Sequence, residues 1–121
     1  MNTSLDTVYL VSNTDAVVTL EIIIGATGQT AQSIISVSGG IFDQDAVGSL
    51  PETVIGTNRE LIDNELSISS VIVDMSPDTN VTEMLIRLRG GIAFREYHLS
   101  KVVDNENEAV PYVILIHFIN I

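Results

Sequence analysis

The sequence AVVTLEIII at residues 16–24 decides the fold class. Every second position of it is apolar, and Thr19 and Glu21 lie between apolar neighbours. A period of two places alternate side chains on opposite faces of a β-strand, and β-branched residues favour that conformation. We therefore expect a strand with one buried face, formed by Ala16, Val18, Leu20, Ile22 and Ile24.

Similar alternation recurs on both sides of this stretch. We expect further strands in four ranges: 5–12, 31–38, 66–75 and 82–89. A change of apolar parity at Ser69-Ser70 predicts a β-bulge, and residues 58–65 have the composition for one turn of helix at most. Short strands with turn signals at this spacing predict that residues 1–121 form one all-β domain. We expect an antiparallel β-sandwich, immunoglobulin-like in general layout, with about seven or eight strands.

Two glycine pairs mark predicted hairpins. Gly39-Gly40 and Gly90-Gly91 each separate two strand-like runs, and glycine tolerates the positive φ of a type I′ turn. A two-residue turn at 90–91 fixes the register, so that Leu88 faces Ala93. The same register places five ionisable residues on one face: Glu83, Arg87, Arg89, Glu96 and His98.

This arginine-bearing face has two interpretations. In the structural interpretation, these residues form cross-strand ion pairs on a solvent-exposed face. The functional one is a small basic patch, centred on Arg87 and Arg89, that docks an acidic segment of a partner or of a neighbouring copy.

Composition excludes several classes of protein. The chain has 121 residues, of which 45% are hydrophobic, so a packed core is possible and disorder is disfavoured despite a net charge of -11. No apolar run reaches the roughly 20 residues of a membrane-spanning helix. The first ten residues contain no base and no sustained apolar run, so we expect no signal peptide. Cysteine is absent, which excludes disulfides and thiolate metal sites.

The charge points to a protein partner. Sixteen acidic residues against five basic ones disfavour a nucleic-acid backbone or an anionic membrane surface as the ligand. Residues 1–58 contain no Lys or Arg, and three of the five bases are Arg87, Arg89 and Arg95. Attraction between these two regions of opposite charge predicts head-to-tail self-association.

The residues needed for catalysis are sparse. His98 and His117 are the only histidines, and no serine lies in a G-x-S-x-G motif. The sequence GATGQT at 25–30 lacks the lysine of a phosphate-binding loop. We therefore expect a protein that is not an enzyme and has no cofactor other than a metal ion.

Two acidic loops are the candidate binding sites for such a metal ion. They are separated by two predicted strands, so they should emerge at the same end of the sheet. Calcium prefers six to eight oxygen ligands, although the spacing here is not that of an EF-hand. The candidate calcium ligands are Asp74, Asp78, Asp104, Glu106 and Glu108. Solvated acidic turns are the alternative.

The last predicted strand is apolar on both faces. One face carries Val110, Tyr112, Ile114, Ile116 and Phe118, and the other carries Val113, Leu115, Ile119 and Ile121. A sandwich strand needs only one apolar face, so we expect a central strand with a second cover. Either the same chain or a second subunit supplies it, and the latter predicts a homo-oligomer or a complex.

The sequence therefore predicts a non-enzymatic structural or protein-interaction module that associates through its sheet. Its candidate interaction residues are Arg87, Arg89, Tyr112, Ile114, Ile116 and Phe118. One alternative is a calcium-dependent or carbohydrate-binding module, for which the absence of tryptophan leaves few stacking residues. Another is an acidic inhibitor of a basic partner protein.

Overall fold

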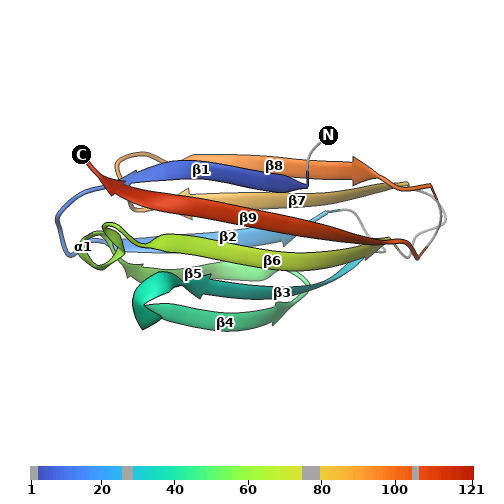
Figure 1. Cartoon of the computed structure of the whole chain (residues 1–121), viewed down its shortest axis with the longest axis horizontal. Helices are drawn as coiled ribbons and strands as arrows, with labels where there is room; N and C mark the ends of the chain where they lie inside the picture. The colour runs from blue at the N-terminus through green and yellow to red at the C-terminus, as the bar shows by residue number, and fades with distance from the viewer. Residues whose placement is uncertain (1–2, 26–28, 75–79, 105–106) are drawn as a thin grey trace.

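The computed structural model describes residues 3–25, 29–74, 80–104 and 107–121, which form two β-sheets packed face to face (Figure 1). One sheet has five strands in the order β1-β9-β6-β3-β4, and the other has four in the order β5-β2-β7-β8. The strands are β1 (Ser4–Val11), β2 (Val17–Ile24), β3 (Gln29–Val37), β4 (Phe42–Val47), β5 (Leu50–Thr57), β6 (Glu65–Asp74), β7 (Val81–Arg89), β8 (Arg95–Val102) and β9 (Ala109–Asn120). The predicted all-β sandwich is confirmed.

Two details of the architecture differ from the prediction. The described residues form nine strands rather than seven or eight. The pairs of the sandwich are antiparallel except one, because β1 runs parallel to β9 from Ser4, opposite Val113, to Val11, opposite Asn120. The first strand therefore forms one edge of the five-stranded sheet, beside the interior strand β9.

The core lies between the two sheets. On β2 four of the five residues predicted for the inner face are buried, namely Val18, Leu20, Ile22 and Ile24. The prediction is wrong for Ala16, which precedes the strand and is exposed. Burial of one such aliphatic side chain contributes roughly 1.5–3 kcal/mol. Tyr9 and Phe118 meet edge to face in the same core, with ring centroids 6.2 Å apart.

The predicted bulge in β6 is wrong. The register of β6 with β3 and β9 is continuous, and its even-numbered residues are buried along the whole strand. The change of apolar parity arises because Ser70 points inward, where its Oγ lies 2.7 Å from Oγ of Ser33, itself buried. Val71 and Val73 accordingly point outward.

Both hairpins form, but neither has the predicted two-residue turn. Val37 pairs with Phe42, so four residues including the short 3-10 turn η1 (Ser38–Gly40) connect β3 to β4. Leu88 pairs with Arg95 rather than Ala93, a shift of two residues that preserves which side chains share a face.

Contacts across the sandwich explain the longer loop at residues 90–94. Gly90 has a φ of +100°, and a Cβ there would lie 2.0 Å from the carbonyl oxygen of Val17. The N–H of Gly91 donates to the Tyr9 hydroxyl, and the N–H of Ile92 donates to the carbonyl of Leu10. The loop therefore bonds to β1 and lies against β2 instead of closing tightly on itself.

The predicted turn of helix is confirmed as α1 (Asn58–Leu61). Thr57 caps it, with the Thr57 side chain accepting from the N–H of Glu60 and the Glu60 side chain accepting from the N–H of Thr57. The buried Asn58 amide bonds to the backbone of Ser12, Ala16 and Gly90. The helix thereby ties the β1–β2 connection and the β7–β8 loop to the core.

Candidate functional site

β9 lies inside the sheet between β1 and β6, as predicted, but the described residues do not cover its second face, where Val113 is 56% exposed. Four of its candidate interaction residues face the domain's own core and are 0% exposed: Tyr112, Ile114, Ile116 and Phe118. The Tyr112 hydroxyl donates to the carbonyl of Thr82 on the other sheet at 3.0 Å. A partner that contacts β9 therefore meets its opposite face, not these four side chains.

That opposite face belongs to an exposed apolar patch on the outer surface of the five-stranded sheet. The patch consists of Ile34, Val47, Val71 and Val113, from four different strands. The register brings them together, since Ile34 and Val113 both pair with Ser69, while Val47 and Val71 both pair with Gln32. Shallow hollows of about 310 and 380 Å³ lie over β4, β3 and β6 here.

Acidic side chains border the outer apolar patch. On β4, Asp45 pairs with Ile34 and Asp43 lies two residues away; on β1, Asp6 pairs with Leu115, two residues from Val113. Glu65 lies on the same face but farther away, paired with His117. The described strands of this sheet contain no Lys or Arg. The outer face of the five-stranded sheet is therefore apolar and negatively charged.

His117 is the one histidine of this face within its five described strands. Its Nε2 lies 3.1 Å from Asp6 Oδ1, and its Nδ1 lies 3.3 Å from Glu65 Oε2. The ring separates the two carboxylates, and the described residues contain no group of acidic and histidine side chains able to hold a metal ion. His117 is half-exposed, as expected for a strand histidine.

Arg87 and Arg89 lie on the outer face of the other sheet, as predicted, and form ion pairs there. Arg87 Nε lies 2.7 Å from Glu96 Oε2, and Arg89 Nη1 lies 3.1 Å from Glu21 Oε1. Longer contacts of 3.5 Å join Arg87 to Glu21 and of 3.9 Å join Arg89 to Glu52. The two guanidinium groups are therefore balanced by carboxylates of the same chain.

These pairs perturb the protonation of their members. The hydrogen bond from Arg89, together with the charges of both arginines, holds the pKa of Glu21 below its ordinary value. The hydrogen bond to Glu96 raises the pKa of Arg87 in turn. The arrangement supports the ion-pair interpretation of this face, and a docking role for Arg87 and Arg89 stays a prediction.

The described ends of the two acidic loops lie together at one end of the sandwich, as predicted. The N–H of Asn107 donates to the carbonyl of Asp74 at 2.8 Å, and Val73 pairs with Ala109. Among the predicted calcium ligands, Asp74 is buried, Glu108 is half-buried and Asp104 is exposed. Asp78 and Glu106 lie outside the described residues, so calcium binding stays a prediction.

Comparisons with known proteins identify no relative. No family model, curated protein or solved structure matches the chain. In the part of the chain that the structure describes, no helix has both the length and the apolarity to cross a membrane.

The sequence predicts the apolar outer face of β9, which includes Val113, but not the contributions of Ile34, Val47 and Val71 to the outer apolar patch, although one signal for Val71 is present. The apolar parity of β6 changes where Val71 and Val73 follow Ser70, and a bulge was the interpretation. An unbroken strand with the same sequence must instead place two valines on the solvent face. Their neighbours on other strands depend on a register that no local pattern fixes.

Proposed function

We propose that the protein is a non-catalytic protein-interaction module that binds its partner through the outer face of the five-stranded sheet. The observation that carries this proposal is the outer apolar patch of Ile34, Val47, Val71 and Val113, bordered by carboxylates. Exposed apolar patches with a polar border are typical of protein-binding surfaces.

The charge of this face selects the chemistry of the partner. Asp45 lies beside Ile34, Asp6 and Asp43 lie one ladder step farther along, and the described strands beneath the patch carry no Lys or Arg. Charges across an interface are arranged to be complementary, so the partner presents an apolar centre bordered by Lys and Arg. Two copies packed face to face through this sheet would oppose carboxylate to carboxylate, which favours a different protein over a symmetric homodimer.

The proposal is tested by substitution of the patch in cells that naturally make the protein. Val71→Lys/Val113→Lys removes two apolar contacts, with side chains 45% and 56% exposed, and adds cations that repel a basic partner. We expect the wild-type chain to elute from size exclusion in a complex and this double variant to elute at the mass of the free chain. High salt should weaken the wild-type complex, because screening reduces the attraction between the borders.

Val54→Lys/Val102→Lys is the matched control. These valines lie on the four-stranded sheet and are 52% and 46% exposed, so the two double variants differ in location and not in chemistry. The control should elute in the complex, and circular dichroism should show both variants folded. A wild-type chain that elutes alone, or a complex that both variants lose equally, would refute the proposal.

A further inference from the structure

The free edge of β1 is the least protected of the four sheet edges. Sheet edges usually exclude other strands by charges, prolines or bulges. The edge strand β4 carries Asp43 and Asp45, and β5 contains Pro51 and two shifts of register. The edge strand β8 has four ionisable residues: Arg95, Glu96, His98 and Lys101. In contrast, β1 has Asp6 alone and pairs with β9 without a break over eight residues.

The hydrogen bonds of β1 show which backbone groups face this edge. The carbonyls of Thr3 and Val11 accept from amides on the β9 side, at 2.9 and 3.4 Å. In a parallel pair alternate residues bond to the same neighbour, so the N–H and C=O groups of Asp6 and Val8 point away from β9. The carbonyl of Leu10, in the same set, accepts from the loop at residues 90–94. The groups of Asp6 and Val8 are thus placed to pair with an added strand.

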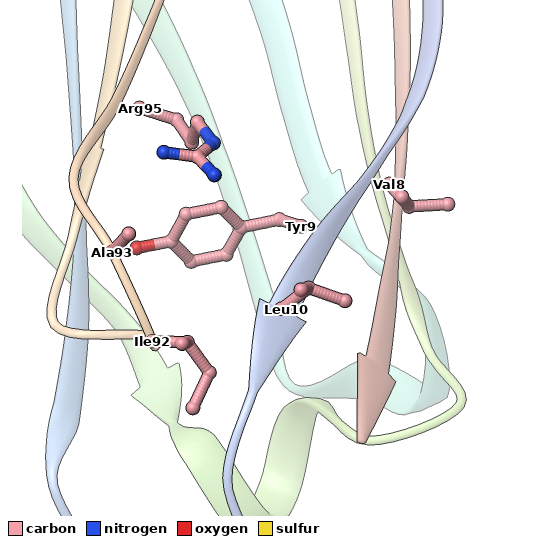
Figure 2. Close-up of a pocket in the computed structure, with 6 residues that line it drawn as sticks. All are labelled: Val8, Tyr9, Leu10, Ile92, Ala93 and Arg95. Carbon is pink, nitrogen blue, oxygen red and sulfur yellow. The ribbon is translucent and has the colours of Figure 1, made fainter. Parts of the chain in front are cut away.

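A small pocket opens beside this edge (Figure 2). It has a volume of about 220 Å³ and lies between β1 and the beginning of β8. Its lining residues are Val8, Tyr9, Leu10, Ile92, Ala93 and Arg95. Sites for small molecules usually exceed about 300 Å³, so this pocket better suits one side chain of an extended segment.

The polar groups of the pocket match a carboxylate. Among the described residues Arg95 forms no salt bridge, and its Nη1 donates only to the carbonyl of Phe94, at 3.1 Å. Figure 2 shows its guanidinium group beside the Tyr9 ring. The Tyr9 hydroxyl accepts from the N–H of Gly91 at 3.0 Å, and burial raises its pKa, so it keeps a proton to donate. Arginine and tyrosine together supply donors for a carboxylate.

We propose that β1 binds an extended segment of another protein that carries an aspartate or glutamate. The backbone of the segment pairs with Asp6 and Val8 and continues the five-stranded sheet. One inward-facing side chain of the segment enters the pocket, where its carboxylate binds Arg95 and the Tyr9 hydroxyl. Main-chain hydrogen bonds supply affinity in this mode, and the pocket supplies specificity.

A second copy of the chain fits this edge poorly. In a second copy, the acidic edge strand β4 would be the candidate to pair with β1. Its Asp43 and Asp45 lie on the outer face of the sheet. In a sheet continued from β1 to the β4 of another copy, with outer faces aligned, these carboxylates would lie near Asp6 and away from Arg95. Like charges so placed oppose the pairing.

The test selects random eight-residue peptides on the immobilised full-length chain. We expect the selected peptides to share one Asp or Glu among alternating apolar or β-branched residues. Replacement of that acid by Asn or Gln should weaken binding about tenfold or more, the usual scale for loss of a charge-assisted hydrogen bond. In the bound state, hydrogen exchange at the amides of Asp6 and Val8 should slow.

Two variants assign the binding to the edge and the pocket. Val8→Pro removes an N–H that points away from β9, so no bond to β9 is lost and the strand should still form. This variant should abolish binding of the peptide. Val8→Thr keeps the N–H and should preserve binding. Arg95→Gln should remove the preference for the acidic peptide over its amide counterpart.

Selection without an acidic consensus, or acidic peptides that bind Val8→Pro as tightly as wild type, would overturn the proposal. The Val71→Lys/Val113→Lys variant should bind these peptides normally. Failure of the sheet-face proposal and failure of the edge proposal are therefore distinguishable.

Discussion

At the scale of single residues, Asn58 connects parts of the molecule that no strand pairing joins. Its side chain is 0% exposed and bonds to the backbone of Ser12, Ala16 and Gly90, at distances of 2.8 to 3.1 Å. These groups belong to the connection between β1 and β2 and to the loop after β7. Without the side-chain amide, the N–H of Ser12 and the carbonyl of Gly90 would lose this partner, whereas the carbonyl of Ala16 would keep its bond from the Asn58 backbone N–H.

We therefore predict that Asn58→Ala lowers the free energy of unfolding by about 2 kcal/mol, because the N–H of Ser12 and the carbonyl of Gly90 lose their partner. Urea denaturation monitored by circular dichroism measures the change. Asn120→Ala, at an exposed strand end, is the control and should stay within about 0.5 kcal/mol of wild type. Equal effects of the two substitutions would contradict the assigned role of Asn58.

The hydroxyl pair of Ser33 and Ser70 gives a second prediction at this scale. Either single substitution by alanine leaves a buried hydroxyl without its partner, at a cost of about 1–2 kcal/mol. The double variant Ser33→Ala/Ser70→Ala should be more stable than the sum of the single changes predicts. A double-mutant cycle in urea measures the coupling, and strict additivity would show that the two hydroxyls do not interact.

At the scale of elements, the ion pairs of β2, β7 and β8 make part of the stability dependent on pH. The pKa of Glu21 is lower in the folded state, mainly through its hydrogen bond from Arg89. Above the ordinary pKa of 4.5 both states carry the carboxylate, and the folded state gains from the ion pair. As the pH falls below 4.5 the unfolded state binds the proton first, and this contribution is lost.

Glu21→Gln should accordingly be less stable than wild type at neutral pH, and the difference should shrink as the pH falls below 4.5 through the lowered folded-state pKa. Urea midpoints from pH 7 to pH 3 at low salt measure it. High salt should reduce the difference at pH 7, since these side chains are partly exposed. A difference that is constant with pH would contradict the ion-pair account.

The strand faces were predicted correctly in β2 but not in β6. In β2 the alternation of Val18, Leu20 and Ile22 was sufficient, because a two-residue period has one interpretation when one face is wholly apolar. In β6 it was not, because a buried Ser70 beside an outward Val71 mimics a bulge. The local sequence of β6 cannot show that the inward hydroxyl of Ser70 is hydrogen-bonded to Ser33 on another strand.

The candidate site was less predictable than the fold for a related reason. The apolar residues of β9 were visible in the sequence, but their two faces looked alike, and the face named for interaction is the one in the core. Which face is buried depends on the opposing sheet. The register of β7 with β8 was displaced by two residues, because the loop bonds to β1, far away in sequence. The faces were correct since a shift of two preserves parity.

At the scale of the whole molecule, charge is divided between the two sheets. The described strands of the five-stranded sheet carry no Lys or Arg, whereas Arg87, Arg89, Arg95 and Lys101 all belong to the four-stranded sheet. Arg87 and Arg89 are balanced within their own sheet, which weakens the basis for head-to-tail attraction between copies. The predicted homo-oligomer stays a prediction, and the distribution of charge favours a different, basic protein as the partner.

Site-specific photo-crosslinking in cells that naturally make the protein tests whether the outer face of the five-stranded sheet binds another protein. A photoreactive residue at Val113, on the outer face of the five-stranded sheet, should form an adduct with one other protein, through a peptide of that protein that lies next to Lys or Arg. The same residue at Val102, on the four-stranded sheet and of similar exposure, should form none. No adduct at Val113 above the level at Val102, or an adduct at Val113 with a second copy of this chain, would contradict the account.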